Sequence, residues 1–175
     1  MALQPATNRQ VPDHAILDRY NKQAYLGNRY SFILPVTAGG TTEVAQIILS
    51  NPLLATTSFQ NQVGLFVDLR RLVSSNVTAA SNVMRMYLNP TVTSVGTPQT
   101  PQNMRPASPN VSASSLHSAP TISANGTLVE ALSSGAFGTV QSEAIFIVDP
   151  GQTLLITVQT ANGGIVVPAI SWNEI

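Results

Sequence analysis

The chain has 175 residues, and its eight basic residues (Lys and Arg) balance eight acidic ones, so that the formal net charge is zero. Scattered, balanced charge excludes a nucleic-acid-binding surface, because affinity for phosphates requires clustered cations. The chain has no cysteine, which excludes disulfide scaffolds and thiolate zinc sites. No apolar run approaches the ~20 residues of a membrane helix and no secretion signal is recognisable, so we expect a soluble protein made in the cytoplasm.

Uncharged polar residues take the place of charged ones. Ser, Thr, Asn and Gln form about a third of the chain, whereas only 9% of its residues are charged and 43% are hydrophobic. That hydrophobic fraction is sufficient for a folded domain. A surface of hydroxyls and amides with no net charge is poorly suited to a free monomer, and it favours a protein that is packed into an assembly.

Residues 1–29 predict an N-terminal arm that carries a short amphipathic helix. Pro12 is typical of a helix start and Gly27 of a helix end, and Ile16, Leu17 and Tyr20 recur between them on one stripe. A helix of about three turns is not stable alone, so it must lie against another surface. Two alternatives stay open: the arm packs on its own domain, or it docks on a neighbouring subunit.

From residue 30 onward the apolar period changes to two, which is typical of half-buried strands. The alternation predicts that Phe32 and Leu34 share one face of a strand, as do Met84 and Met86. The predicted strands cover residues 30–36, 43–49, 63–69, 83–88, 119–122, 127–132 and 165–172.

The clearest predicted hairpin covers residues 144–158. Pro150 and Gly151 fit its centre, because a type II turn favours Pro at its second position and Gly at its third. With no helix between the strands, about eight short strands predict an all-β sandwich or jelly roll over residues 30–175.

Residues 89–120 differ from the rest, because they hold half of the chain's 12 prolines. Proline lacks a backbone donor, so we expect no central strand here. The segment predicts an ordered, extended excursion across the surface of the domain. Its apolar contacts would be Val92, Val95, Met104 and Leu116.

Catalytic chemistry is not indicated by the distribution of titratable residues. The two histidines, His14 and His117, have no partner at metal-ligand spacing, and we expect both on the surface. The carboxylates are isolated in sequence. The adjacent pair Arg70 and Arg71 stands at a predicted strand end, either solvated or paired with a partner subunit. We therefore predict that the protein is not an enzyme and has no cofactor or metal site.

Residues 30–175 resemble a loose group of tailed-bacteriophage virion proteins, small β-sandwiches that decorate capsids or form head and tail appendages. The motifs that carry the resemblance are N-P-T (89–91), G-T-P-Q-T-P-Q-N (96–103), N-G-T-L (125–128), I-F-I-V-D-P-G-Q-T-L-L-I (145–156) and I-S-W-N-E-I (170–175). The resemblance implies a jelly-roll-like fold, often trimeric, with no catalytic residues. The arm is not part of the shared pattern.

The leading functional hypothesis is a capsid decoration (cement) protein on the outer capsid surface of a virion. It would bridge neighbouring capsomers and bind the major capsid protein and copies of itself as a homo-oligomer, with a trimer favoured. The expected contact residues are Ile16, Leu17 and Tyr20 of the arm and the four apolar residues of the excursion. The alternative is a tail or fibre component that recognises a host receptor such as a glycan.

Overall fold

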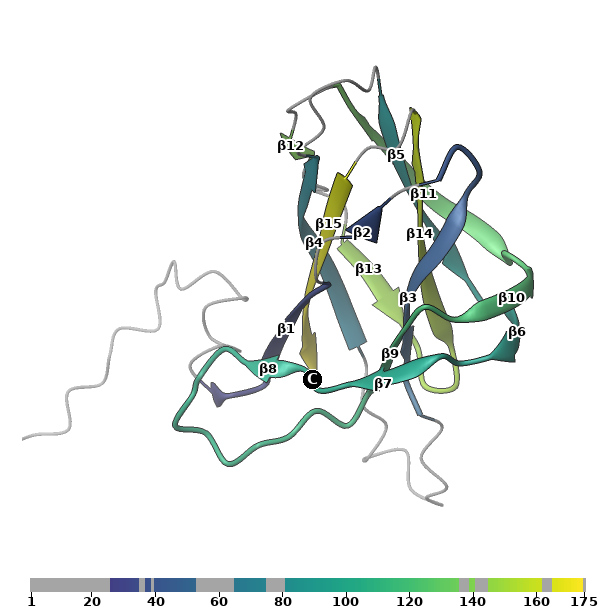
Figure 1. Cartoon of the computed structure of the whole chain (residues 1–175). Coiled ribbons are helices and arrows are strands. Elements are labelled where there is room, and N and C mark those ends of the chain that lie inside the picture. Colours follow the sequence, from purple (N-terminus) through teal and green to yellow (C-terminus); the bar gives the residue numbers. More distant parts are fainter. Residues whose placement is uncertain are drawn as a thin grey trace, which may run out of the picture.

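The computed structural model describes residues 26–34, 37–38, 40–52, 65–74, 81–135, 139–140, 145–161 and 165–174 (Figure 1). Within these residues the protein is all-β and its strands form antiparallel sheets, as the sequence predicts. The predicted helix between Pro12 and Gly27 lies outside the described residues except for its last ones. Gly27 is described and has a φ of 77°.

Sheet A is the seven-stranded sheet on the left of Figure 1. Its order is β12-β4-β15-β1-β8, with β13 also paired to β4 and β2 to β15. The strands are β1 (Arg29–Ile33), β2 (Thr37–Ala38), β4 (Leu65–Ser74), β8 (Gln102–Asn103), β12 (Thr139–Val140), β13 (Ile145–Val148) and β15 (Ile165–Glu174).

Sheet B, with six strands, lies opposite sheet A. Its order is β11-β5-β14-β3-β9-β7. The strands are β3 (Val44–Ser50), β5 (Asn82–Leu88), β7 (Thr97–Gln99), β9 (Ser115–Ser118), β11 (Thr127–Ser134) and β14 (Thr153–Thr160).

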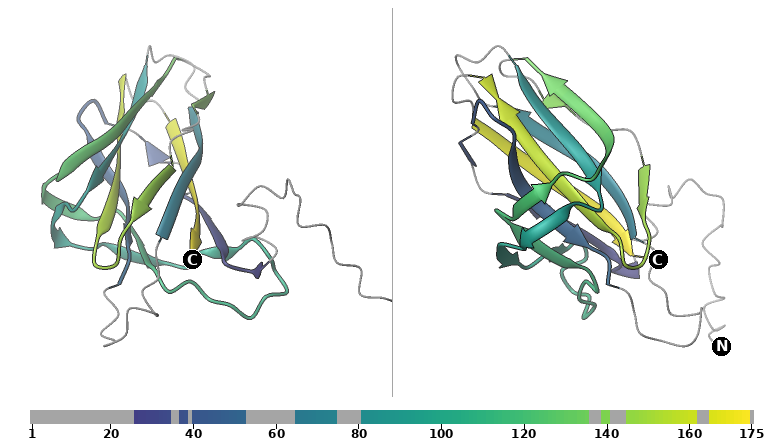
Figure 2. Two further views of the ribbon diagram at one scale, coloured as in Figure 1. Left: turned by 180° about the vertical axis from the view of Figure 1, so that it is seen from behind. Right: turned by 90° about the vertical axis from the view of Figure 1, so that its right-hand side faces the viewer.

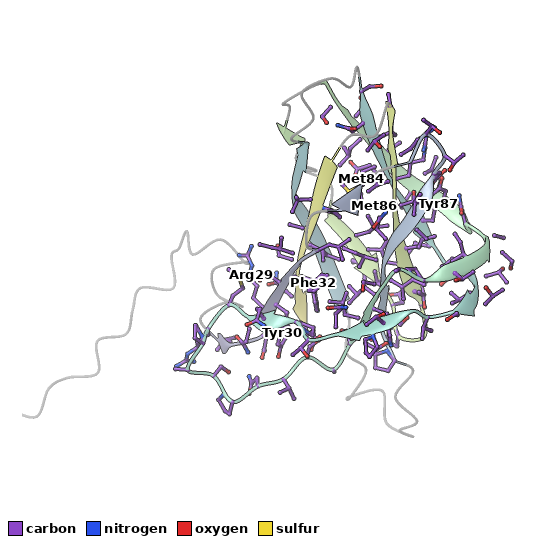
Figure 3. The ribbon with its side chains drawn as sticks, in the orientation of Figure 1. Arg29, Tyr30, Phe32, Met84, Met86 and Tyr87 are labelled. Carbon is purple, nitrogen blue, oxygen red and sulfur yellow. The ribbon has the colours of Figure 1, made fainter. Side chains whose placement is uncertain are left out.

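One hydrophobic core joins the two sheets. It includes Phe32 and Trp172 from sheet A and Met84, Met86 and Ile156 from sheet B, all at most 8% exposed. Figure 3 shows Met84 and Met86 on the side of sheet B that faces sheet A, with Tyr87 on the other side. The alternation predicted for the β1 and β5 segments is therefore confirmed, and it follows from the strand period of two.

A third, two-stranded sheet covers the outer face of sheet B. This sheet C pairs β6 (Thr91–Ser94) with β10 (Thr121–Ala124). Its residues Val92 and Ile122 pack on a small cluster formed by Ile48, Tyr87 and Leu155, whose side chains point outward from sheet B. The views in Figure 2 agree that β6 and β10 lie outside sheet B. Where sheet C covers sheet B, the molecule therefore has three layers, in the order A, B, C.

The predicted turn at Pro150 and Gly151 is confirmed, but the predicted hairpin is wrong. Gly151 has a φ of 83°, and the amide of Gln152 donates to the carbonyl of Asp149 at 3.0 Å. The two flanking strands do not pair with each other: β13 pairs with β4 in sheet A, and β14 pairs with β3 and β5 in sheet B. The turn therefore carries the chain from one sheet to the other.

The expectation of an excursion without a central strand is also wrong in part. The segment 89–120 contains β6 to β9, and β9 lies between β3 and β7 inside sheet B. Residues 115–118 contain no proline, so they have the donors that a central strand needs. Together with β2 and β12, which were not predicted either, these short strands bring the number in the described part to 15, above the predicted number of about eight. Arg70 and Arg71 lie inside β4 and not at its end.

Candidate interaction surface

The structure separates the four apolar residues predicted as contacts in the excursion. Val95 and Met104 are each 49% exposed. Val92 instead packs on the outer cluster of sheet B, and Leu116 is 2% exposed within the main core. The backbone pairing of β9 with β3 aligns Leu116 with Leu49 and turns it inward. The side chains of Val92 and Leu116 therefore stabilise the fold. Ile16, Leu17 and Tyr20 of the arm lie outside the described residues.

The excursion passes around one end of the molecule, from sheet C through β7 to β8 on sheet A (Figure 1). Beyond β8 the chain turns at residues 104–114 and returns to sheet B as β9. This returning loop carries exposed apolar side chains, because Met104 is 49% and Val111 is 86% exposed.

The carboxylate of Glu174 holds the returning loop at its base. Glu174 is only 8% exposed, and its oxygens accept hydrogen bonds from both side chains and backbone amides of the loop. The donors are Ser112 Oγ at 2.6 Å, Ser114 Oγ at 2.7 Å, the Ala113 amide at 2.9 Å and the Ser114 amide at 3.3 Å, together with Trp172 Nε1 at 3.1 Å. The loop is thus fixed to the last strand of sheet A by a charged acceptor.

Two asparagines fix the same loop to the segment that precedes β1. The side-chain amide of Asn103 donates to the carbonyl of Gly27 at 3.0 Å and to the carbonyl of Asn110 at 2.9 Å. The side-chain amide of Asn110 donates to Oδ1 of Asn28 at 3.1 Å. The start of β1 and the loop therefore form one hydrogen-bonded unit.

A groove of about 260 Å³ lies beside this unit, on the outer face of sheet A. Most of its lining comes from outward-facing positions of β1 and β15, where Ser31 pairs with Ser171 and Ile33 with Ala169. Arg29, Phe32 and Ile170 of the same two strands also line it. Met104 completes the lining. Figure 3 shows Arg29 directed away from the core, unlike Phe32.

Ile33 stands between this groove and a second hollow. The second hollow measures about 500 Å³ and lies between β1 and the segment 98–102 of the excursion. Ile33 lines both and is 62% exposed. An isoleucine so exposed, which lines one groove together with Met104, is an apolar feature that a further segment of protein could cover.

Polar side chains form a separate cluster on the outer face of sheet B. Arg85 lies 3.4 Å from the carboxylate of Glu43 and donates to Gln159 Oε1 at 3.0 Å, while Thr157 donates to Glu43. Burial raises the pKa of Tyr87 in this cluster, and its hydrogen bond to Glu43 raises it further. Burial likewise raises the pKa of Tyr30 in the core, with a smaller contribution from the charge of Glu174.

The described residues contain no group of three or more His, Cys, Asp or Glu that could hold a metal ion. Nor does any helix in the described part of the chain have the length and apolar character to cross a membrane. His117 lies on β9, opposite Pro98 of β7, and its Nδ1 atom is buried.

Two residues of this surface were not predicted from the sequence: Ile33, which lines both hollows, and Glu174, which binds the returning loop. The alternation in 30–36 did contain a signal for Ile33, because it placed this residue on the face opposite Phe32 and Leu34. Glu174 had no such signal, since its partners lie about 60 residues away along the chain.

In comparisons with protein-family models, curated proteins and solved structures, no match to this chain was found.

Proposed function

We propose that this chain is a structural virion protein with a jelly-roll fold, and more specifically a capsid decoration (cement) protein on the outer capsid surface. It would bind the major capsid protein and copies of itself, with a trimer as the favoured oligomer, and bridge neighbouring capsomers. Three features support the proposal: the order of the strands, the fixed apolar loop, and the burial of those aromatic side chains that the structure describes.

The strand order supports the jelly roll. The first major strand, β1, pairs with the last, β15, and the next pairs inward are β3 with β14, β4 with β13 and β5 with β11. This nested pairing is that of one long hairpin rolled into two facing sheets, which is how eight-stranded jelly rolls are built. Viral capsid proteins use this fold, but so do other proteins, so function must come from the surface.

The observation that carries the functional proposal is the fixed apolar loop at 104–114. Val111 is 86% exposed, yet it directly precedes the residues that Glu174 holds, and Asn110 ties the other side of Val111 to Asn28. An exposed apolar side chain on a loop that is already ordered loses little further entropy when a partner covers it. Such a loop is suited to repeated contacts with a shell.

The buried aromatic residues favour attachment to protein over receptor glycans. Carbohydrate sites require accessible aromatic faces, whereas Trp172, Tyr30, Phe32 and Tyr87 are all at most 8% exposed. Within the described part of the chain, the exposed large apolar side chains are aliphatic. A role as a receptor-binding tail or fibre component therefore has less support than decoration of the shell.

The test is binding to purified shells that lack the protein, measured by co-sedimentation and by labelled imaging of whole particles. We expect the full chain to saturate equivalent sites on the shell. Val111→Asp should weaken binding by about tenfold or more, because a buried contact would become charged, whereas Val111→Leu should bind normally. Normal occupancy by Val111→Asp would remove the loop from the contact, and no binding by the full chain would refute the proposed function.

A deletion tests the arm separately. Removal of residues 1–25 keeps the hydrogen bonds of Gly27 and Asn28 and every described residue of the core. We expect lower occupancy on the shell if Ile16, Leu17 and Tyr20 form contacts with it. Unchanged occupancy would show that the arm has no part in attachment.

A further inference from the structure

We propose that the groove on the outer face of β1 and β15 is the docking site for residues 12–24 of the chain's own N-terminal arm. This inference goes beyond the proposed function, because it concerns the free protein before any shell is present. It rests on the shape of the groove, on the way the chain reaches it, and on the pattern of the arm.

The groove has a floor of small residues between apolar walls. Ser31, Ala169 and Ser171 provide the outward-facing floor, and Ile33 and Met104 stand beside it with 62% and 49% exposure. Small side chains on the floor leave room for bulky ones from above. Covering Ile33 and Met104 would remove apolar surface from water, which is the main driving force for such docking.

The chain reaches the groove at one of its ends. The carbonyl of Arg29 accepts from the Met104 amide at 2.9 Å, so the first residue of β1 lies directly against the groove wall. Just before it, Gly27 is held by Asn103, and the carbonyl of Asn28 accepts from the Glu174 amide at 2.9 Å. The positive φ of Gly27, 77°, allows the chain to reverse its direction at this point.

The arm offers a matching apolar stripe at short range. Ile16, Leu17 and Tyr20 recur at helical spacing, and residue 24 is only five positions before Arg29. As a helix, residues 12–24 would span about 20 Å, whereas β1 from Arg29 to Ile33 spans about 13 Å. The segment is therefore long enough to cover the groove.

The short connection between residue 24 and Arg29 favours binding of the chain's own arm over binding of the arm of a second copy. A tether of a few residues gives the docked segment an effective concentration of about millimolar. The arm of a second free copy would have to compete at the concentration of the protein itself. In dilute solution, docking within one chain is therefore favoured.

Engineered cysteine pairs test the proposal directly, because the chain has no cysteine of its own. We expect Leu17→Cys with Met104→Cys to form an intramolecular disulfide on mild oxidation, identified by mass spectrometry of the digested monomer. The control pair, Leu17→Cys with Leu128→Cys, should stay reduced. Leu128 is a suitable control because it is 52% exposed and lies on β11 of sheet B. Equal oxidation of both pairs, or no oxidation of either, would overturn the proposal.

A mixture of the two single variants distinguishes the chain's own arm from that of a neighbour. Equimolar Leu17→Cys and Met104→Cys proteins can join only between chains. We expect far less disulfide in this mixture than in the double variant. Equally efficient formation of the mixed dimer would show that the groove takes the arm of a second copy, contrary to the proposal.

Limited trypsin digestion provides a second measurement without cysteines. The arm contains cleavage sites at Arg19 and Lys22. Because cleavage follows the population of the undocked arm, Ile33→Asp should speed it by about tenfold or more. Leu128→Asp is the matched control and should leave the rate unchanged. Equal rates for Ile33→Asp and the natural sequence would overturn docking in this groove, whereas a failure of shell binding would leave this result intact.

Discussion

Replacement of Glu174 by glutamine should destabilise the protein through a single hydrogen-bond mismatch. In the structure one carboxylate oxygen accepts from the side chains of Ser112, Ser114 and Trp172, and the other accepts from the Ala113 amide. Glutamine keeps only one acceptor oxygen. If that oxygen serves the side-chain donors, the new NH₂ group must face the Ala113 amide, so that two donors meet.

The magnitude follows from the number of bonds affected. An unsatisfied buried donor costs about 1–3 kcal/mol, and the remaining bonds lose the contribution of the charge. The carboxylate's own desolvation cost disappears in the variant and offsets part of the loss. We expect Glu174→Gln to lower the free energy of unfolding by about 2 kcal/mol, a large part of the ~5–15 kcal/mol of a typical domain. Glu174→Ala should lose about 3–4 kcal/mol, since all the donors of the loop lose their acceptor.

Urea unfolding measures this change, with Trp172 as the sole tryptophan and a fully buried one. Circular dichroism must be recorded as a second probe, because Trp172 itself contacts Glu174. Glu43→Gln is the matched control: its side chain is 25% exposed, so removal of its ion pair should cost less than about 1 kcal/mol. A loss below about 0.5 kcal/mol for Glu174→Gln would refute the idea that the carboxylate fixes the loop.

Three further predictions concern pH, a turn and the core. Burial raises the pKa of both Tyr30 and Tyr87 above 10.0. As the pH rises, these tyrosines ionise first in the unfolded chain, so the free energy of unfolding should fall above about pH 10. The double variant Tyr30→Phe, Tyr87→Phe should show a smaller fall, measured as urea midpoints at each pH. Gly96→Ala should lower the free energy of unfolding by about 2 kcal/mol or more in the same assay, because Gly96 has a φ of 84° and a new Cβ would overlap carbonyl oxygens at the end of β9. In the control variant Gly40→Ala the new Cβ meets no atom closer than 3.4 Å, so the free energy of unfolding should change little. Ile156→Ala should lower thermal stability by about 2–5 kcal/mol, since Ile156 is fully buried between the sheets; a loss below 1 kcal/mol would contradict its place in the core.

Local patterns predicted local structure well. The alternation of Met84 and Met86 identified β5 and its buried face, because successive side chains of a strand point to opposite sides. Pro150 and Gly151 identified a turn, because their preferred backbone angles are those of its central positions. Each of these features depends on neighbouring residues alone.

Pairing between distant strands could not be predicted in the same way. The 144–158 segment has the pattern of a hairpin, but β13 pairs with β4, where Ile145 is opposite Asp68. Leu116 occurs in a proline-rich segment and becomes a core residue only through the pairing of β9 with β3. These outcomes depend on which surfaces meet in three dimensions, and the sequence of one segment does not contain that information.

The transfer of the chain between sheets at Asp149–Gln152 has a consequence for how the protein folds. Along the chain β3, β4 and β5 alternate between the two sheets, and so do β11, β13, β14 and β15, so neither sheet consists of consecutive strands. The outermost pair of strands, β1 and β15, can join only after all the residues between them, 34–164, have been synthesised. Because loop closure over such separations costs entropy before any contact repays it, we expect refolding on a time scale of about milliseconds to seconds, in one cooperative step.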